Sequence, residues 1–73
     1  MKRKPLPEWN PSDIRLLRLH CGMTQQDLAD ELAVRQATIS EWECGKYKPR
    51  RFIRLQLLNL AERARFHVKG TES

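Results

Sequence analysis

The sequence predicts an all-α fold of four to five helices, with two short helices and a tight turn at its centre. Three observations support this prediction. Apolar residues recur at spacings of three and four positions in successive segments, as on one face of a helix. Two of these segments follow N-terminal capping patterns, N-x-x-D at Asn10 and T-x-x-D at Thr24. Gly22 separates these two segments and suits the left-handed residue that ends many helices.

The first expected helix carries signals at both ends. Three residues mark its start: Asn10 as the cap, Pro11 at the first helical position and Asp13 in the capping box. Its apolar face consists of Ile14, Leu17 and Cys21, with Leu16 alongside them. Trp9 pairs with Ile14 across the cap, so we expect the indole at the edge of the core rather than stacked on a ligand. Gly22 then ends the helix.

Two short helices and a turn are expected within residues 23–49. A cap at Thr24 and a hydrophobic staple between Met23 and Leu28 begin the first of them. Its inward face consists of Leu28, Ala29 and Leu32. The apolar pattern restarts after Val34, and the inward residues are then Ile39 and Trp42. The second helix therefore exposes a row of short polar side chains and one methyl group, made of Gln36, Ala37, Ser40 and Glu41.

A fourth helix is expected over residues 51–66, because no glycine occurs between Gly45 and Gly70 and residues 61–65 have high helix propensity. Its apolar residues cover two faces. One face has Ile53, Leu57, Leu60, Ala61 and Ala64, and the other has Phe52, Leu55 and Leu58. Either the small core nearly encloses this helix, or the second face meets a second subunit. We favour the second subunit, which makes Phe52, Leu55 and Leu58 the candidate dimerisation residues.

Length and charge set further bounds. The 73 residues fit one domain with a small core, and they carry a net charge of +5 with a mean hydropathy of −0.70. Two basic clusters stand out, Lys2, Arg3 and Lys4 near the N-terminus, and Lys46, Lys48, Arg50, Arg51 and Arg54 further on. Between them, residues 25–44 contain five acids and a single base, Arg35. The clusters either bind a polyanion or only keep the domain soluble, and charge alone does not decide between them.

The sequence gives no support for an enzyme, a metal site or a cofactor. Cys21, Cys44, His20 and His67 lack the spacing of zinc ligands, and neither a nucleophile–base pair nor a glycine-rich phosphate loop occurs. We expect Cys21 as a partly buried helix residue and Cys44 as a plain thiol, with a disulfide or redox role as the alternative. No apolar run approaches the roughly 18 residues of a membrane span. We therefore expect a cytoplasmic protein without a membrane partner.

Residues 23–49 resemble the Cro/C1 repressor-type (XRE) helix-turn-helix family, whose pattern runs roughly LTQxxLAxxLGVSxxTISxWExGxxxP. In this chain the pattern appears as Met23-Thr24-Gln25, Leu28-Ala29, Leu32-Ala33-Val34, Thr38-Ile39-Ser40, Trp42-Glu43, Gly45 and Pro49, with Met23 in place of its first leucine and Ala33 in place of its glycine. The likeness continues back to Ile14 and forward to about Ala61 without gaps. It implies a lambda-repressor-like DNA-binding domain with a central helix-turn-helix.

The resemblance also implies roles for individual residues. The second helix of the motif, the recognition helix, would enter the DNA major groove and read bases through Gln36, Ala37, Ser40 and Glu41. Gln36 suits adenine and Ala37 suits the thymine methyl group. Phosphate binding would fall to Gln25, Arg35, Lys46, Tyr47, Lys48 and Arg50. The family glutamine at the position of Gln25 also braces a base-reading residue. In the family an arginine of the first helix pairs with the glutamate that ends the recognition helix, so Arg18 and Glu43 form the expected structural ion pair.

Two residues depart from the family pattern. Arg35 takes the place of a Ser or Thr helix cap; it is a poor cap but a plausible phosphate or guanine ligand. Glu41 stands where the family more often has Arg, Lys or Gln. Its carboxylate either accepts a hydrogen bond from cytosine N4, or faces solvent or pairs with a nearby base of the protein.

We expect three regions: a flexible basic arm at residues 1–8, the helix-turn-helix domain at residues 9–67 and a polar tail at residues 68–73. The arm either follows the DNA backbone or minor groove, or is a disordered tail. The predicted function is that of a sequence-specific double-stranded DNA-binding transcriptional regulator. A small bacterial or phage repressor would bind a palindromic operator as a homodimer, because one domain contacts few bases, and would be nucleoid-associated when bound. The alternative is an antitoxin or adaptor that binds a protein through the helix at residues 51–66.

Overall fold

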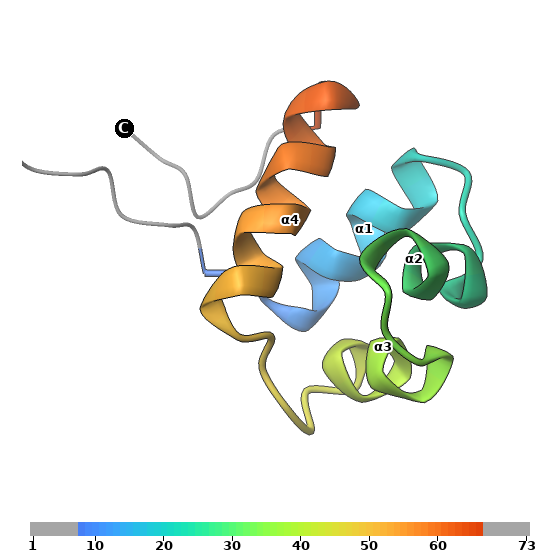
Figure 1. Cartoon of the computed structure of the whole chain (residues 1–73), viewed down its shortest axis with the longest axis vertical. Helices are drawn as coiled ribbons and strands as arrows, with labels where there is room; N and C mark the ends of the chain where they lie inside the picture. The colour runs from blue at the N-terminus through green and yellow to red at the C-terminus, as the bar shows by residue number, and fades with distance from the viewer. Residues whose placement is uncertain (1–7, 67–73) are drawn as a thin grey trace, which may run out of the picture.

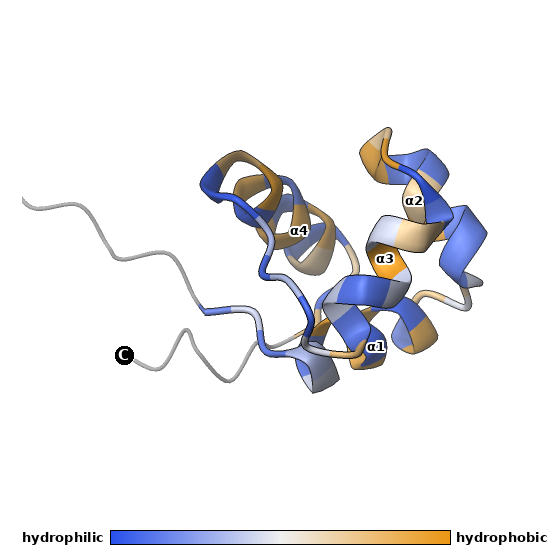
Figure 2. Ribbon diagram, turned by 90° about the horizontal axis from the view of Figure 1, so that it is seen from below, coloured by the Kyte–Doolittle hydropathy of each residue, from blue (hydrophilic) through white to orange (hydrophobic). Residues whose placement is uncertain are grey.

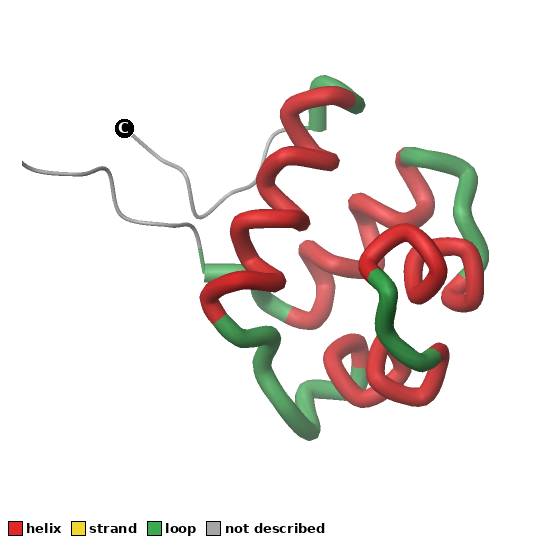
Figure 3. Tube along the Cα trace, viewed as in Figure 1, coloured by secondary structure: helices red, strands yellow, loops and turns green. Residues whose placement is uncertain are grey.

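A computed structural model describes residues 8–66, and within this range the chain forms four helices and no strands (Figures 1 and 3). The helices are α1 (Pro11–His20), α2 (Gln25–Leu32), α3 (Gln36–Glu43) and α4 (Arg51–Arg63). The all-α prediction with a central pair of short helices is confirmed. Apart from Glu8, the predicted arm lies outside the described residues, and so do His67 and the tail.

The four helices begin in two different ways. At α1, the Asn10 N–H donates to the Asp13 carboxylate at 3.4 Å, and Asp13 is buried. At α2, the Asp27 N–H donates to Thr24 Oγ1 at 3.0 Å, and the Thr24 N–H donates to Asp27 Oδ2 at 2.9 Å. These are the two predicted capping boxes. By contrast, α3 and α4 begin at arginine caps whose side chains form no capping hydrogen bond.

All four helices end in the same way. The chain passes through one left-handed residue, and the N–H of the next residue donates back to a carbonyl in the last turn over 2.8–2.9 Å, as in the Schellman motif. The four left-handed residues are Gly22, Ala33, Gly45 and Arg65. Three of the residues that follow them are apolar and pack against the core, namely Met23, Val34 and Phe66. Each turn is therefore held by a hydrogen bond, and three also by burial.

The fourth helix is shorter than the sequence predicts. It ends at Arg63 instead of residue 66, because Arg65 adopts a left-handed conformation with φ of 56°. Phe66 then turns back onto the core, and its ring lies 5.4 Å from the His20 ring. His20 Nε2 also lies 2.8 Å from the carbonyl oxygen of Ala64. Packing and capping at this end outweigh the high helix propensity of residues 61–65.

The core lies between α4 and the three helices α1, α2 and α3. Its buried apolar residues come from every helix and from the segment just before α1: Trp9, Ile14, Leu17, Leu28, Ala29, Leu32, Ile39, Trp42, Leu57, Leu60 and Ala61. Trp9 is buried, as predicted from the cap. Leu16 is not: its side chain is 48% exposed. Successive helical residues differ by about 100°, so burial of Leu17 turns Leu16 away from the core.

The structure also describes the two cysteines, the candidate metal ligands and the hydropathy of the helices. Cys21 is half-buried, Cys44 is exposed, and both are free thiols. Among residues 8–66, no three His, Cys, Asp or Glu side chains gather as metal ligands would. None of the described helices has the length and hydropathy needed to span a membrane.

Candidate nucleic-acid interface

The recognition helix α3 is held by two buried apolar side chains. Ile39 and Trp42 anchor it in the core, and α3 packs closely against α2 and also against α1 (Figure 1). Because helical residues three and four apart share a face, the side opposite these anchors carries the four predicted base-reading residues. Of these, Gln36 and Ala37 are exposed, and Ser40 and Glu41 are half-buried. The structure thus places all four on one outward surface of a fixed helix.

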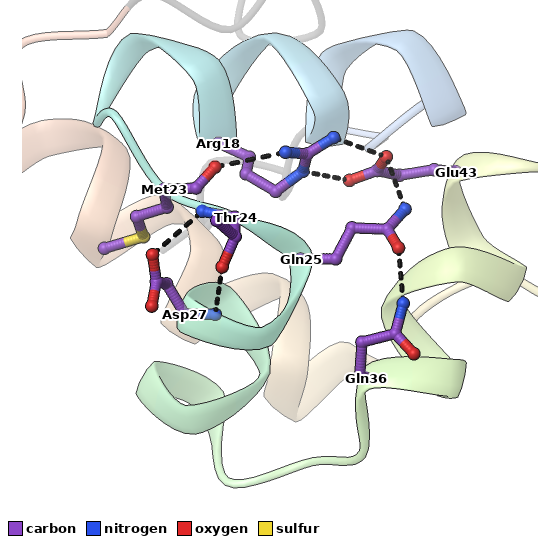
Figure 4. Close-up of polar contacts among 7 residues, drawn as sticks. All are labelled: Arg18, Met23, Thr24, Gln25, Asp27, Gln36 and Glu43. Atoms are coloured by element: carbon purple, nitrogen blue, oxygen red, sulfur yellow. Dashed lines mark hydrogen bonds and ion pairs between the residues drawn. The ribbon is translucent and has the colours of Figure 1, made fainter.

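A chain of side-chain hydrogen bonds ties the recognition helix to α1 and α2 (Figure 4). Arg18 of α1 donates to both carboxylate oxygens of Glu43, over 2.8 and 3.1 Å. Gln25 of α2 donates through Nε2 to Glu43 Oε1 at 3.2 Å, and its Oε1 accepts a hydrogen bond from Gln36 Nε2. Arg18 further donates to the Met23 carbonyl at 3.1 Å. The network orients Gln36 through its neighbours.

The ion pair within this network is shielded from solvent, with 13% of the Arg18 side chain and 7% of the Glu43 side chain exposed. Burial alone would raise the pKa of Glu43, but hydrogen bonds from Arg18 and Gln25, with the charges of Arg18 and Arg15, lower it below its usual value. The hydrogen bond with Glu43 likewise raises the pKa of Arg18, against the effect of desolvation. Both groups are therefore charged at neutral pH.

The Gln25 side chain braces the predicted base-reading residue Gln36, as the resemblance implies, and it also bonds to Glu43. Its amide oxygen and amide nitrogen are both engaged within the protein, by Gln36 and Glu43. The link from Gln25 to Glu43 was not predicted from the sequence, because no spacing rule relates residues on separate helices. Gln25 remains at the first position of α2, where backbone N–H groups are free to meet an anion.

The loop between α3 and α4 supplies the basic side of the surface. Lys46, Tyr47, Lys48 and Arg50 are exposed along it, and Figure 2 colours most of this loop as hydrophilic. Lys46 Nζ lies 5.7 Å from the centre of the Tyr47 ring, within cation–π range. These four predicted phosphate ligands therefore lie together, directly after the recognition helix. Arg35 is the fifth predicted phosphate ligand with a cationic or aromatic side chain. It lies apart from the other four, at the exposed N-cap of α3.

Glu41 is the member of the base-reading row that lies beside the basic loop. It lines a shallow hollow with Thr38, Trp42, Tyr47, Lys48, Arg50 and Ile53. No cation among the described residues lies within ion-pair distance of its carboxylate. Its carboxylate therefore forms no ion pair with the loop cations that line the same hollow.

The candidate dimerisation residues lie on α4. Phe52 is 69% exposed and Leu55 is 39% exposed, whereas Leu58 is half-buried. The face of α4 with Leu57, Leu60 and Ala61 is buried in the core. The structure thus separates the two apolar faces that the sequence predicts, and it leaves the second face uncovered among residues 8–66.

The fold and this surface together define the class of protein, an all-helical DNA-binding domain of the helix-turn-helix type. The helix-turn-helix family of the Cro/C1 (XRE) type matches residues 14–53, which is more than half of the chain. The chain belongs to that family. No curated protein matches the chain.

Proposed function

We propose that the protein is a sequence-specific double-stranded DNA-binding transcriptional regulator, a small bacterial or phage repressor that occupies an operator. The observation that carries this proposal is the outward row on α3 beside the basic loop. Short polar side chains can approach base edges in the major groove, and lysine and arginine side chains bind the phosphates on either side. The firmly packed helix and the ion pair beneath it provide the rigidity that such a surface needs.

Within this proposal, the residues divide by their chemistry. Gln36 donates to and accepts from adenine, the Ala37 methyl group packs on thymine, and Ser40 and Glu41 complete the base-reading row. Phosphates are bound by Arg35, Lys46, Tyr47, Lys48 and Arg50, and by the backbone at Gln25. Because Gln36 is already bonded to Gln25 through Nε2, its oxygen and second amide hydrogen remain available to a base.

We also propose that two copies bind a palindromic site as a homodimer. One domain with four base-reading residues contacts too few base pairs to select an operator alone. Phe52, Leu55 and Leu58 supply an apolar contact face on α4, and exposed aromatic and aliphatic side chains of this kind mark interaction surfaces. In a symmetric dimer the two recognition helices would lie about 34 Å apart, one turn of DNA.

A second candidate function rests on the same α4 face. An antitoxin or adaptor would use Phe52 and Leu55 to bind a protein partner instead of a second copy. The two functions are compatible, because the α4 face and the α3 row involve different residues. The repressor acts by binding DNA, whereas the antitoxin or adaptor acts by binding a protein partner.

A salt series of DNA binding tests the proposed function. We expect log Kd to depend steeply on log salt concentration, with a slope of several units, because each bound phosphate releases counterions. Selection from random duplexes should return a palindrome. A shallow slope together with monomeric protein at every concentration would refute the repressor proposal and favour the protein-interaction module.

A further inference from the structure

The hydrogen-bond network that joins Arg18 to Gln36 has only one possible direction at its inner end (Figure 4). A guanidinium group carries five N–H donors and no acceptor, so Arg18 can only donate. It donates to both carboxylate oxygens of Glu43, over 2.8 Å from Nε and 3.1 Å from Nη2. Its lowered pKa keeps the Glu43 carboxylate ionised at neutral pH, and an ionised carboxylate can only accept.

This direction continues through Gln25 to the recognition helix. An amide side chain has an oxygen that accepts on one side and an NH₂ group that donates on the other. Gln25 directs its Nε2 at Glu43 Oε1, 3.2 Å away, and its Oε1 accepts a hydrogen bond from Gln36 Nε2. The opposite orientation of Gln25 would set its oxygen against the carboxylate, with no hydrogen between the two acceptors. Glu43 therefore determines which end of the Gln36 amide meets Gln25.

The network runs from the shielded interior of the domain to its surface. The side chains of Arg18 and Glu43 are 13% and 7% exposed, Gln25 is half-buried, and Gln36 is exposed. Hydrogen bonds shielded from water are stronger, and a mismatched one costs more free energy. Gln36 presents its oxygen and one hydrogen of its NH₂ group to a ligand, because the other hydrogen is used by Gln25.

The two purines differ in what they require from such an amide. In the major groove adenine offers an acceptor at N7 and a donor at N6, whereas guanine offers acceptors at both N7 and O6. An amide that presents one oxygen and one hydrogen matches adenine, and it sets its oxygen against O6 of guanine. An amide turned over presents both hydrogens of its NH₂ group, which matches guanine. The orientation of the Gln36 amide thus decides between adenine and guanine.

We propose that Glu43 is a positioning residue for base selection: it acts through Gln25 to fix the orientation of the Gln36 amide, and so makes the recognition helix select adenine over guanine. This inference rests on the proposed function, because it requires that Gln36 reads a base. Glu43 thereby has a role beyond its structural ion pair with Arg18. It determines which base is read although its own side chain is shielded from DNA.

The test compares two duplexes that differ at a single base pair. The starting duplex is the one returned by selection from random sequences, and Gln36→Ala locates the pair that Gln36 reads. The Kd is then measured with adenine and with guanine at this position. We expect the wild-type protein to prefer adenine by about ten-fold, as for a bidentate contact. The ratio of the two Kd values is independent of protein stability, because both duplexes bind the same folded protein.

Glu43→Gln should reverse the direction of the network. The new amide oxygen at position 43 accepts from Arg18, and the new NH₂ group turns towards Gln25 and donates to it. Gln25 then turns over, and Gln36 presents two hydrogens to the base. The preference for adenine should fall by about ten-fold or more, to parity or to a preference for guanine. Glu62→Gln removes an exposed carboxylate of α4 and is the matched control, which should keep the wild-type preference.

Exchanging the acid and the amide should restore the preference for adenine. When Gln25→Glu is combined with Glu43→Gln, the new carboxylate at position 25 accepts from both of its neighbours. Gln36 then presents its oxygen and one hydrogen again, as in the wild-type protein. The exchange leaves the net charge unchanged, so a restored preference follows from the direction of the hydrogen bonds.

A further variant keeps the proposal testable if Glu43→Gln does not fold. Arg18→Met combined with Glu43→Met removes both ions, so that no shielded charge is left unpaired. Gln25 is then free to adopt either orientation, and so is Gln36. The preference for adenine should be lost in this variant, without the reversal expected for Glu43→Gln.

The outcomes distinguish this inference from the proposed function. An adenine preference that survives in Glu43→Gln and in the double methionine variant would overturn the inference, as would an exchange variant that fails to restore it. Equal loss of preference at every base pair of the site would also overturn it, because Glu43 would then only hold α3 in place. A protein that binds no duplex at any salt concentration contradicts the proposed function itself.

Discussion

Ala33 ends α2 in a left-handed conformation, with φ of 58° and ψ of 43°. The family pattern has glycine at this position, and two of the other three helix ends in this chain also use glycine. A side chain with a Cβ is strained there, because the Cβ crowds the following carbonyl oxygen. The chain tolerates this strain because Val34 packs on the core and its N–H donates to the Ala29 carbonyl at 2.9 Å.

Ala33→Gly should therefore stabilise the protein by about 0.5–1 kcal/mol, since relief of the left-handed strain exceeds the added freedom of the unfolded chain. Urea unfolding monitored by circular dichroism measures the change. Ala37→Gly is the control, because the same substitution inside α3 should destabilise. Equal effects at both positions would show that Ala33 is not strained.

The Arg18–Glu43 ion pair makes the free energy of unfolding depend on pH in the acid range. The pKa of Glu43 is lower in the folded protein than its ordinary value of 4.5, so the unfolded state binds more protons as the pH falls through this range. The contribution of the ion pair to the free energy of unfolding is complete above about pH 4.5. It is lost as the pH falls through the lower pKa that Glu43 has in the folded state. Unfolding free energy should therefore decrease with acid more steeply in the wild-type protein than in Glu43→Gln.

Unfolding by urea across this acid range measures the slopes. Glu62→Gln removes an exposed carboxylate of α4 and should keep the wild-type slope. At neutral pH, Arg18→Met should cost about 3 kcal/mol, because it leaves the shielded Glu43 carboxylate without its cation. If Glu43→Gln keeps the wild-type dependence of the unfolding free energy on pH, the assignment of this dependence to Glu43 is wrong.

Among the elements, the recognition helix begins without a side-chain cap, as α4 also does. Its N-cap is Arg35, whose side chain forms no capping hydrogen bond, whereas α2 begins with a complete capping box. Ser or Thr would satisfy one free N–H of the first turn. The chain thus has an arginine, suited to phosphate, where helix stability favours a hydroxyl.

Arg35→Ser should raise the free energy of unfolding by about 1 kcal/mol by supplying the missing cap. If Arg35 binds a phosphate, the same variant should bind DNA more weakly and with a salt slope lower by about one. Stability and affinity would then change in opposite directions. Unchanged DNA binding would assign Arg35 no phosphate contact.

Base reading and phosphate binding can be separated by two substitutions on neighbouring elements. Gln36→Ala on α3 should relax the preference at one or two base pairs, at a cost of about 1–3 kcal/mol. Lys48→Ala in the α3–α4 loop should weaken all sequences alike and lower the salt slope. Affinities for the selected site and for single-base variants of it measure both effects. If the two variants behave alike, α3 does not read bases through Gln36.

At the scale of the whole molecule, the second apolar face of α4 is the proposed contact between two copies. Phe52 and Leu55 are exposed on it, and Leu58 is half-buried. Leu16 and Leu19 of α1 are also exposed. Two exposed apolar areas therefore compete as the contact between copies, and substitution can distinguish them.

Leu55→Lys should convert a dimer into a monomer, because it places a charge in the proposed contact face. Its exposed position means that the fold should survive the change. Leu16→Lys is the matched control on α1 and should remain dimeric. Sedimentation equilibrium gives the mass of each variant. A monomeric Leu16→Lys beside a dimeric Leu55→Lys would move the interface to α1.

The sequence by itself determined the all-α class, the starts of all four helices and most of the core. These features follow from local rules, because capping boxes and apolar spacing act within a few residues of the chain. The same rules placed Trp9 in the core. They failed at Leu16, which shares a helix with the core residues but lies outside their face, and at the end of α4.

Only the tertiary structure decided the features that join distant segments. Phe66 ends α4 early because it packs beside His20, and Gln25 links Glu43 to Gln36 because α2 and α3 pack together. The hollow lined by Trp9 and Arg54 likewise forms from two distant segments of the chain, residues 8–10 and residues 48–54. Such contacts depend on the positions of whole helices, which no local pattern specifies. Local chemistry therefore defined the elements, and packing between them defined the surface on which DNA binding is proposed.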